Sequence, residues 1–184
     1  MCTYICRFVI LMRKISYTVP PALDGSSVAA VLRSHGFSTA LLRSLKKTYG
    51  ALSRNGCPVR TVDPVHTGDI VAVELNTDGA TAPPSAEKAV IVYADRDILV
   101  VNKRAGMAMY ETYNHHGNAL SNAVAAAGFD GPFRPIYRLD KDTSGLVLAA
   151  RNSYAAPLLA QGVEKLYYAI VEGCLLYTSP SPRD

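Results

Sequence analysis

One stretch restricts the fold of this chain more than any other: residues 134–150, which read RPIYRLDKDTSGLVLAA. An apolar run ends at Arg138-Leu139-Asp140, a polar turn with small hydroxyl residues and a glycine follows, and a second apolar run leaves it. This pattern predicts a hairpin-like pair of strands with Asp140 displayed at the end of a sheet. Functional groups are commonly carried on loops at such positions.

The carboxylate of Asp140 has several uses in principle. A metal site would need further ligands, and the neighbourhood offers only Asp142. A glycosidase would need a second carboxylate, which folding could bring from a distant position. Asp140 could also cap its own turn and pair with Arg138 for structure alone, since turns are rich in Asp, Ser, Thr and Gly. Residue types alone favour this structural interpretation.

The same stretch resembles the signature of the RluA-type RNA pseudouridine synthases, in which an RLD tripeptide precedes a TSG turn and an apolar strand. Residues 98–107 (ILVVNKRAGM) resemble the early strand and glycine turn of that family, and residues 165–169 (KLYYA) resemble its K-x-Y-x-A strand. Three motifs in the family's order are more specific than any one of them. The resemblance implies an α+β fold with a mixed or antiparallel catalytic sheet.

The resemblance also implies functional roles. Asp140 would be the nucleophile, and Arg138 would take the space of a flipped base or hold backbone phosphate. Tyr167 resembles the active-site tyrosine whose ring packs on the base, and Lys165 would position the carboxylate or the substrate. For Tyr167 and Lys165 the structural alternative is an amphipathic strand with an aromatic face. The isomerisation is redox-neutral, so we expect no cofactor and no metal.

Two residues depart from the family pattern: Tyr137 stands where the family often has His, and Arg104 where it often has Pro. These departures affect the expected turn geometry. The family's later motif, with an arginine that pairs with the catalytic carboxylate, would lie beyond Gly173. We therefore interpret residues 89–173 as the first part of a catalytic domain, and expect the chain as given to isomerise no uridine.

Positive charge is concentrated near the N-terminus. Residues 25–62 contain six Lys or Arg and no Asp or Glu; the rest of the chain has 13 basic and 15 acidic residues, although the whole chain is +4. A solvated helix face normally carries both signs, so this composition favours a phosphate-binding surface. The candidate RNA-binding residues in this region are Arg33, Arg43, Lys46, Lys47 and Arg54.

The order of elements predicts a small domain at residues 13–76. It resembles the alpha-L RNA-binding module of ribosomal proteins, which often precedes the catalytic domain in this synthase family. Serines before two apolar-periodic runs predict helix starts, and an Asn-Gly pair predicts a tight hairpin. The expected elements are an edge strand at 14–23, helices at 28–33 and 39–48, a hairpin around Asn55-Gly56 and a closing strand at 70–75.

Residues 77–88 are rich in Pro, Ala, Thr and Gly without apolar periodicity, as is typical of an interdomain linker. Adjacent residues on one strand or helix point apart, so a metal site at His115-His116 is disfavoured. Beyond the linker we expect strands at 89–94, 97–102 and 165–172, and helices at 119–127 and 154–161.

The two ends have unusual sequences. We expect Met12 to be the natural start, and residues 174–184 resemble the translation of a sequencing-library adapter, which makes them a non-native tail. Outside these ends the one cysteine is Cys57, so no disulfide framework is supported and a reducing, cytoplasmic setting is expected. No apolar run approaches the roughly eighteen residues of a membrane helix.

The leading hypothesis is an RNA pseudouridine synthase that modifies specific uridines in ribosomal or transfer RNA, with RNA as partner, no membrane association and a monomeric state. The alternative is a non-catalytic RNA-binding protein with a synthase-like scaffold. Asp140 separates these two, because a scaffold needs no carboxylate at the turn. A metal-independent glycoside hydrolase is disfavoured by the basic N-terminal region.

Overall fold

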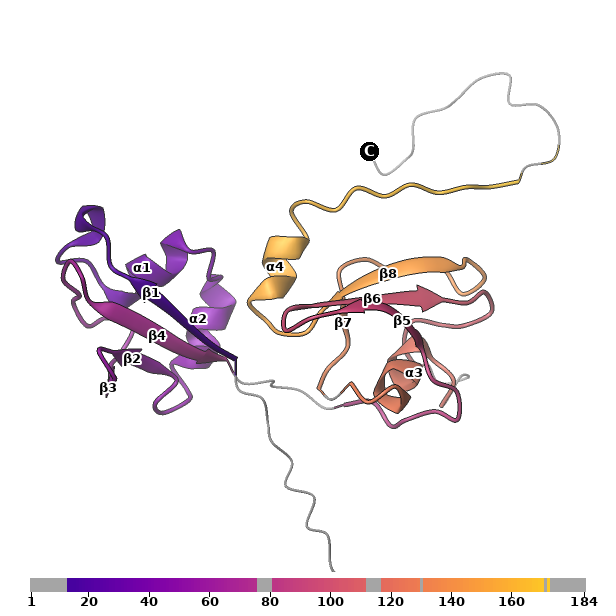
Figure 1. Ribbon diagram of the computed structural model, residues 1–184, viewed down its shortest axis with the longest axis horizontal. Coiled ribbons are helices and arrows are strands. Elements are labelled where there is room, and N and C mark those ends of the chain that lie inside the picture. The colour runs from indigo at the N-terminus through magenta and orange to yellow at the C-terminus, as the bar shows by residue number, and fades with distance from the viewer. Residues whose placement is uncertain (1–12, 76–80, 112–116, 130, 171, 173–184) are drawn as a thin grey trace, which may run out of the picture.

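A computed structural model describes two antiparallel sheets of four strands, each with its own apolar core (Figure 1). This arrangement of helices with antiparallel sheets confirms the α+β class. None of the described helices is long and apolar enough to cross a membrane. The described residues are 13–75, 81–111, 117–129, 131–170 and 172. The predictions made for the start at Met12, for His115-His116 and for residues 174–184 lie outside them.

The first sheet has the strand order β1-β4-β2-β3, so β1 forms one edge, as predicted. β4 is an inner strand, and its inward residues Val71, Val73 and Leu75 are buried. It pairs with β1 from Arg13 opposite Leu75 to Thr18 opposite Ile70. The strands are β1 (Arg13–Thr18), β2 (Leu52–Arg54), β3 (Cys57–Pro58) and β4 (Ile70–Leu75).

Two helices pack on this sheet and begin at the serines predicted as caps. The hydroxyl of Ser27 accepts a hydrogen bond from the backbone N–H of Ala30 at 3.3 Å, and that of Ser38 accepts one from Leu41 at 3.2 Å. Such caps each contribute about 1 kcal/mol. A short 3-10 turn, η1 (Pro21–Leu23), precedes α1 (Val28–Ser34) and α2 (Thr39–Leu45).

The Asn-Gly hairpin between β2 and β3 is confirmed. Asn55 and Gly56 have φ angles of 51° and 83°, which places both central residues in the left-handed region that a two-residue hairpin favours. The side-chain amide of Asn55 donates to Asp69 at 2.7 Å, and its oxygen accepts from the N–H of Ile70 at 2.8 Å. The hairpin is therefore fastened to the turn that begins β4.

The second sheet has the order β5-β6-β8-β7. β6 pairs with β8 from Ile98 opposite Ala150 to Lys103 opposite Gly145. Consequently the loop that follows β6 and the turn that precedes β8 lie at the same end of the sheet. Helix α3 (Leu120–Ala126) packs against this sheet. The strands are β5 (Val90–Ala94), β6 (Ile98–Lys103), β7 (Arg134–Pro135) and β8 (Gly145–Ala150).

Part of the segment interpreted as a linker is bonded to the second unit. The buried side chain of Asn122 in α3 donates to the carbonyl of Pro83 at 2.7 Å. The N–H groups of Ser85 and Ala89 donate to the carbonyls of Asn122 and Ala123 at 3.2 and 2.9 Å. Residues 83–89 therefore form a strap along α3.

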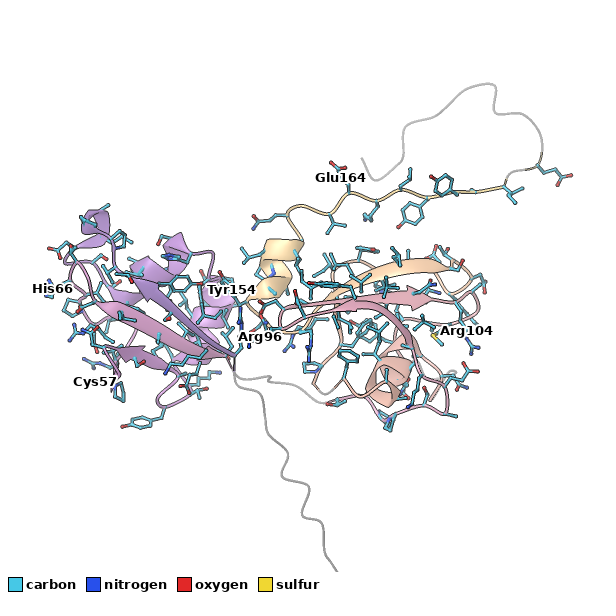
Figure 2. The ribbon with its side chains drawn as sticks, viewed as in Figure 1. Cys57, His66, Arg96, Arg104, Tyr154 and Glu164 are labelled. Atoms are coloured by element: carbon cyan, nitrogen blue, oxygen red, sulfur yellow. The ribbon has the colours of Figure 1, made fainter. Side chains whose placement is uncertain are left out.

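The fourth helix, α4 (Ala155–Leu159), lies between the two units (Figure 1). Tyr154, which precedes it, is directed toward the first unit (Figure 2). Its phenol accepts a hydrogen bond from the phenol of Tyr17 in β1 and donates to the carbonyl of His35, both at 3.0 Å. The two sheets are thus joined by half-buried polar contacts as well as by the chain.

The strand predicted at residues 165–172 is wrong over 165–170, which are extended but unpaired. A strand needs a neighbour to satisfy its N–H and C=O groups, and no described strand pairs with these residues. Their apolar side chains are consequently solvent-exposed: Leu166, Tyr168 and Ile170 are 78%, 93% and 105% exposed. The alternating pattern indicated extended backbone but not a partner for it.

Candidate active site and RNA-binding surface

The loop between β7 and β8 presents the RLD tripeptide at the end of the second sheet. The N–H of Ile136 donates to the carbonyl of Leu148 at 2.8 Å, and the phenol of Tyr137 donates to that of Leu146 at 2.9 Å. Leu139 is 7% exposed and packs in the core. Arg138 and Asp140, on either side of it, are exposed. Burial of one residue therefore turns its two charged neighbours outward.

Lys103, the last residue of β6, is fully buried. Its ammonium donates to the carbonyls of Met107 and Lys141 at 2.8 Å each and to that of Arg104 at 3.1 Å. An ammonium has three donors, so all of them are used within the protein. This side chain ties the loop after β6 to the turn that carries Asp140.

The surroundings of Lys103 affect the pKa of its ammonium in opposite directions, and the net shift is downward. Burial lowers the pKa of the Lys103 ammonium, whereas the carboxylates of Asp142 and Asp140 raise it. Both carboxylates are therefore close enough to interact with a buried cation. The ammonium is hydrogen-bonded to the Lys141 carbonyl of that turn and does not itself reach the surface.

Sequence reasoning missed Lys103, although a signal was present. Along β6, Leu99, Val101 and Lys103 share one face by the two-residue period of a strand, and the first two are buried apolar residues. A lysine on a buried face has to find partners there or lose its charge. The position of Lys103 in that alternation could therefore have indicated a buried lysine with hydrogen-bond partners inside the protein.

A second aromatic ring at this end of the sheet was also missed. Burial of the ring raises the pKa of Tyr110, and the charge of Arg138 opposes this rise only in part. The phenol of Tyr110 donates to the carbonyl of Phe133 at 3.2 Å, and the two rings are 5.9 Å apart. Tyr110 is 42% exposed, so part of its ring remains available next to Arg138.

The K-x-Y segment contacts the hairpin through Lys165. The ammonium of Lys165 lies 5.3 Å from the ring centroid of Tyr137, within the range of a cation–π interaction. Tyr167 is 56% exposed. Among the described residues, no hydrogen bond joins the Tyr167 phenol to the Asp140 carboxylate. The structure thus brings Lys165 to the hairpin and leaves Tyr167 apart from the carboxylate.

Comparison with known proteins decides the family. The sequence profile described as RNA pseudouridylate synthase matches residues 97–183, which include β6, the RLD hairpin and the K-x-Y segment. The chain belongs to this family. The resemblance predicted from the three motifs is confirmed.

Relatives extend the match toward the N-terminus of the chain. A protein named ribosomal large subunit pseudouridine synthase D, from Xylella fastidiosa, is 32% identical over 174 residues, which is 86% of this chain and 51% of the relative. An RNA pseudouridine synthase of Bacillus subtilis is 32% identical over 142 residues, 68% of this chain and 46% of the relative. One of Mycobacterium bovis is 30% identical over 174 residues, 86% and 56%. The chain spans about half the length of these curated relatives.

The six Lys and Arg side chains of residues 25–62 fall into two groups. Arg54 and Arg60 form ion pairs with Asp69 and Asp63, at 3.8 and 3.2 Å. The others are exposed and, within the described part of the chain, form no ion pair. They lie at the end of α1, in α2 and directly after it, and are Arg33, Arg43, Lys46 and Lys47. The structure therefore leaves four of the five predicted RNA-binding residues of this unit unpaired.

Proposed function

We propose that this chain is part of an RNA pseudouridine synthase that isomerises specific uridines in ribosomal or transfer RNA. Asp140 is the nucleophile in this proposal. The observation that carries it is the buried Lys103 ammonium, which fastens the Asp140 turn to the loop after β6 while the carboxylate stays exposed. The turn is anchored to the protein core by Lys103, and the Asp140 carboxylate faces solvent. This arrangement suits attack on a nucleotide that arrives from solvent.

The reaction needs one carboxylate and no change of oxidation state. The bond between C1′ of the ribose and N1 of uracil breaks, the base turns, and C1′ bonds to C5 instead. The Asp140 carboxylate supplies an electron pair to the base or to C1′ and is released when the new carbon–carbon bond forms. C5 then loses its proton and N1 gains one, so product and substrate are isomers.

Arg138 and the aromatic rings serve the flipped nucleotide. Arg138 is exposed two residues before Asp140, where its guanidinium can fill the space left by the base or hold a phosphate. Tyr167 is proposed to stack on the uracil ring, as in the resemblance, and its exposed position requires the K-x-Y segment to approach the hairpin. Lys165, already on Tyr137, guides that approach.

The first unit, residues 13–76, is proposed to be an alpha-L module that binds the phosphates of the substrate RNA, with residues 89–173 belonging to the catalytic domain. The exposed ridge of Arg43, Lys46 and Lys47 supports this assignment. Arg54 contributes less to it, because its guanidinium pairs with Asp69 and its side chain is only 34% exposed. The proposal places the enzyme in the cytoplasm as a monomer, in contact with ribosomal or transfer RNA; the name of the Xylella fastidiosa relative supports ribosomal RNA.

The proposal is tested in the chain extended along its source genome to the length of its relatives. Asp140→Asn is expected to abolish pseudouridine formation, detected by carbodiimide-stop sequencing of ribosomal and transfer RNA, while leaving RNA affinity within a few-fold. Asp142→Asn, in the same turn, is the matched control and should stay active. Activity that survives in Asp140→Asn would favour the scaffold alternative.

A further inference from the structure

A cavity of about 600 Å³ opens on the first unit, away from the candidate catalytic turn. One wall is formed by the residues that end and follow α2, the other by the residues that follow β3. Leu45 and Leu52 form an apolar floor, since both line the cavity and are only 6% and 4% exposed. The cavity is therefore open to solvent on one side and closed by apolar side chains on the other.

The rim of this cavity carries an aromatic ring that the fold does not use. Tyr49 is 95% exposed, so its ring makes almost no contact within the chain. Val62, on the opposite wall, is 64% exposed. A flat, exposed ring above an apolar floor suits a planar ligand with apolar faces.

The charges around the cavity suit an anion next to that planar group. Lys46 and Arg60 both line it, and the Arg60 side chain is 83% exposed. The carboxylate of Asp63 is occupied, because it accepts from the backbone N–H of Arg60 at 2.8 Å and pairs with its guanidinium at 3.2 Å. These bonds keep the pKa of Asp63 below its usual range. A nucleotide matches both features of the cavity, because its planar base has a phosphate on either side.

We propose that this cavity binds one unstacked nucleobase of an RNA strand, with Tyr49 stacked on the base and Lys46 and Arg60 on the flanking phosphates. The proposal rests on the RNA binding proposed above and adds a contact to a base. The ridge contacts only phosphates, which carry no sequence information. The cavity would add selection for RNA that has an unpaired nucleotide next to the phosphates bound by the ridge.

The test uses two fluorescein-labelled strands and the 184-residue chain. One strand is a ten-residue oligouridylate, and the other has the same ribose-phosphate backbone without bases. In anisotropy titrations, Tyr49→Ala is expected to weaken binding of the oligouridylate by about 5- to 150-fold, the loss of one base–aromatic stack, and to leave binding of the abasic strand unchanged. Tyr49→Phe keeps the ring and should bind within about twofold of the parent chain.

A matched control removes an exposed tyrosine elsewhere. Tyr93→Ala in β5, which is 51% exposed, should change neither affinity. Because Tyr49 makes so few contacts, its variants should unfold at the parent temperature. Oligouridylate binding that survives Tyr49→Ala, in a chain still weakened by reversal of the Arg43, Lys46 and Lys47 charges, would overturn the base site and leave RNA binding standing.

Two further results would also count against the base site. An equal loss on both strands would mean that Tyr49 supports the phosphate contacts rather than a base. Failure of the parent chain to bind either strand would overturn this inference and the RNA binding of the proposed function together. The abasic strand is therefore the measurement that separates the two proposals.

Discussion

The two units place their functional groups by different means. In the first unit the buried residues are apolar apart from Thr61, and the candidate RNA-binding residues stand on the surface outside that core. In the second unit the buried residues include a lysine and two asparagines: Lys103, Asn122 and Asn152. Burying polar groups costs free energy unless each is hydrogen-bonded, so each of these side chains needs hydrogen-bond partners inside the protein.

The side-chain nitrogens of those three buried residues all donate to residues in loops. The amide of Asn122 bonds to Pro83 and Glu111 at 2.7 and 2.9 Å, and Lys103 bonds to the loops around Met107 and Lys141. The second unit thus fixes its irregular segments from inside its core. The candidate RNA-binding surface can therefore be altered without changing the fold. The candidate catalytic turn, by contrast, depends on Lys103, and so does the fold.

The largest expected effect is that of Lys103→Met, which separates the units most sharply. The substitution removes three donors and leaves buried carbonyls unpaired, so the free energy of unfolding of the second unit should fall by about 3 kcal/mol. The first unit should be unaffected. Urea titrations followed by NMR signals from each unit measure both.

Arg104→Met is the matched control for that experiment. Arg104 follows Lys103 in the chain, but its side chain is 61% exposed and pairs with Glu87 at 2.6 Å on the surface. Such pairs contribute little, so the change should be within about 1 kcal/mol. A similar loss in both units after Lys103→Met would contradict the contrast between their cores.

The sequence predicted those elements whose signals are local. The caps at Ser27 and Ser38 and the Asn55-Gly56 hairpin close hydrogen bonds with residues next to them, so the residues that decide them are adjacent in the chain. The RLD hairpin was found for the same reason. Its two apolar flanks and its polar turn lie within one short stretch.

Features that depend on distant residues could not be predicted in this way. The role of Lys103 requires the carbonyl of Lys141, and the junction of the units requires Tyr154 to meet Tyr17. The strand expected after Lys165 failed because pairing depends on another strand, which a local alternation does not specify. For the candidate site, the sequence thus identified the carboxylate but not the cation that holds its turn.

A second prediction concerns the surface of the first unit. Reversing Arg43, Lys46 and Lys47 to Glu should flatten the salt dependence of RNA binding by about two units of slope, if each contacts one phosphate of a single strand. Over a fourfold change in salt, that corresponds to roughly a 16-fold difference in affinity. Titrations of oligouridylate at several salt concentrations measure the slope.

The same triple variant should unfold like the parent chain, since all three side chains are exposed. That result would show surface function to be independent of the core in this unit. An unchanged slope would instead mean that the ridge is only solvated. Reversal of Lys14, Lys88 and Arg96, which lie outside the ridge, controls for the change in net charge.

A smaller effect is expected at the junction of the units. Tyr154→Phe removes the hydrogen bonds to Tyr17 and to the carbonyl of His35 and should cost about 1 kcal/mol in the coupling between the two unfolding transitions. Tyr93→Phe, which removes an exposed bond to Asp95 within one turn, should leave the coupling unchanged. If the unfolding midpoints of the two units are the same in Tyr154→Phe as in the parent chain, this contact does not couple them.

The smallest expected effect is a difference in acid sensitivity. In the first unit, hydrogen bonds from backbone N–H groups are the main cause that holds the pKa values of Asp24, Asp63 and Asp69 below the ordinary range; in the described part of the second unit, only Asp95 is shifted in this way. A carboxyl with a lowered folded pKa adds stability that is complete above its unfolded value of about 3.9 and is lost as pH falls through the folded pKa.

Acidification below about pH 4 should therefore weaken the first unit more than the second. Asp69→Asn should reduce this acid-dependent loss, because the amide cannot titrate yet its oxygen can still accept from the N–H of His66. Urea midpoints of each unit measured between about pH 2 and pH 6 are the test. Parallel decline of both units, or an Asp69→Asn variant with the parent's pH dependence, would show that turn carboxylates do not distinguish the two.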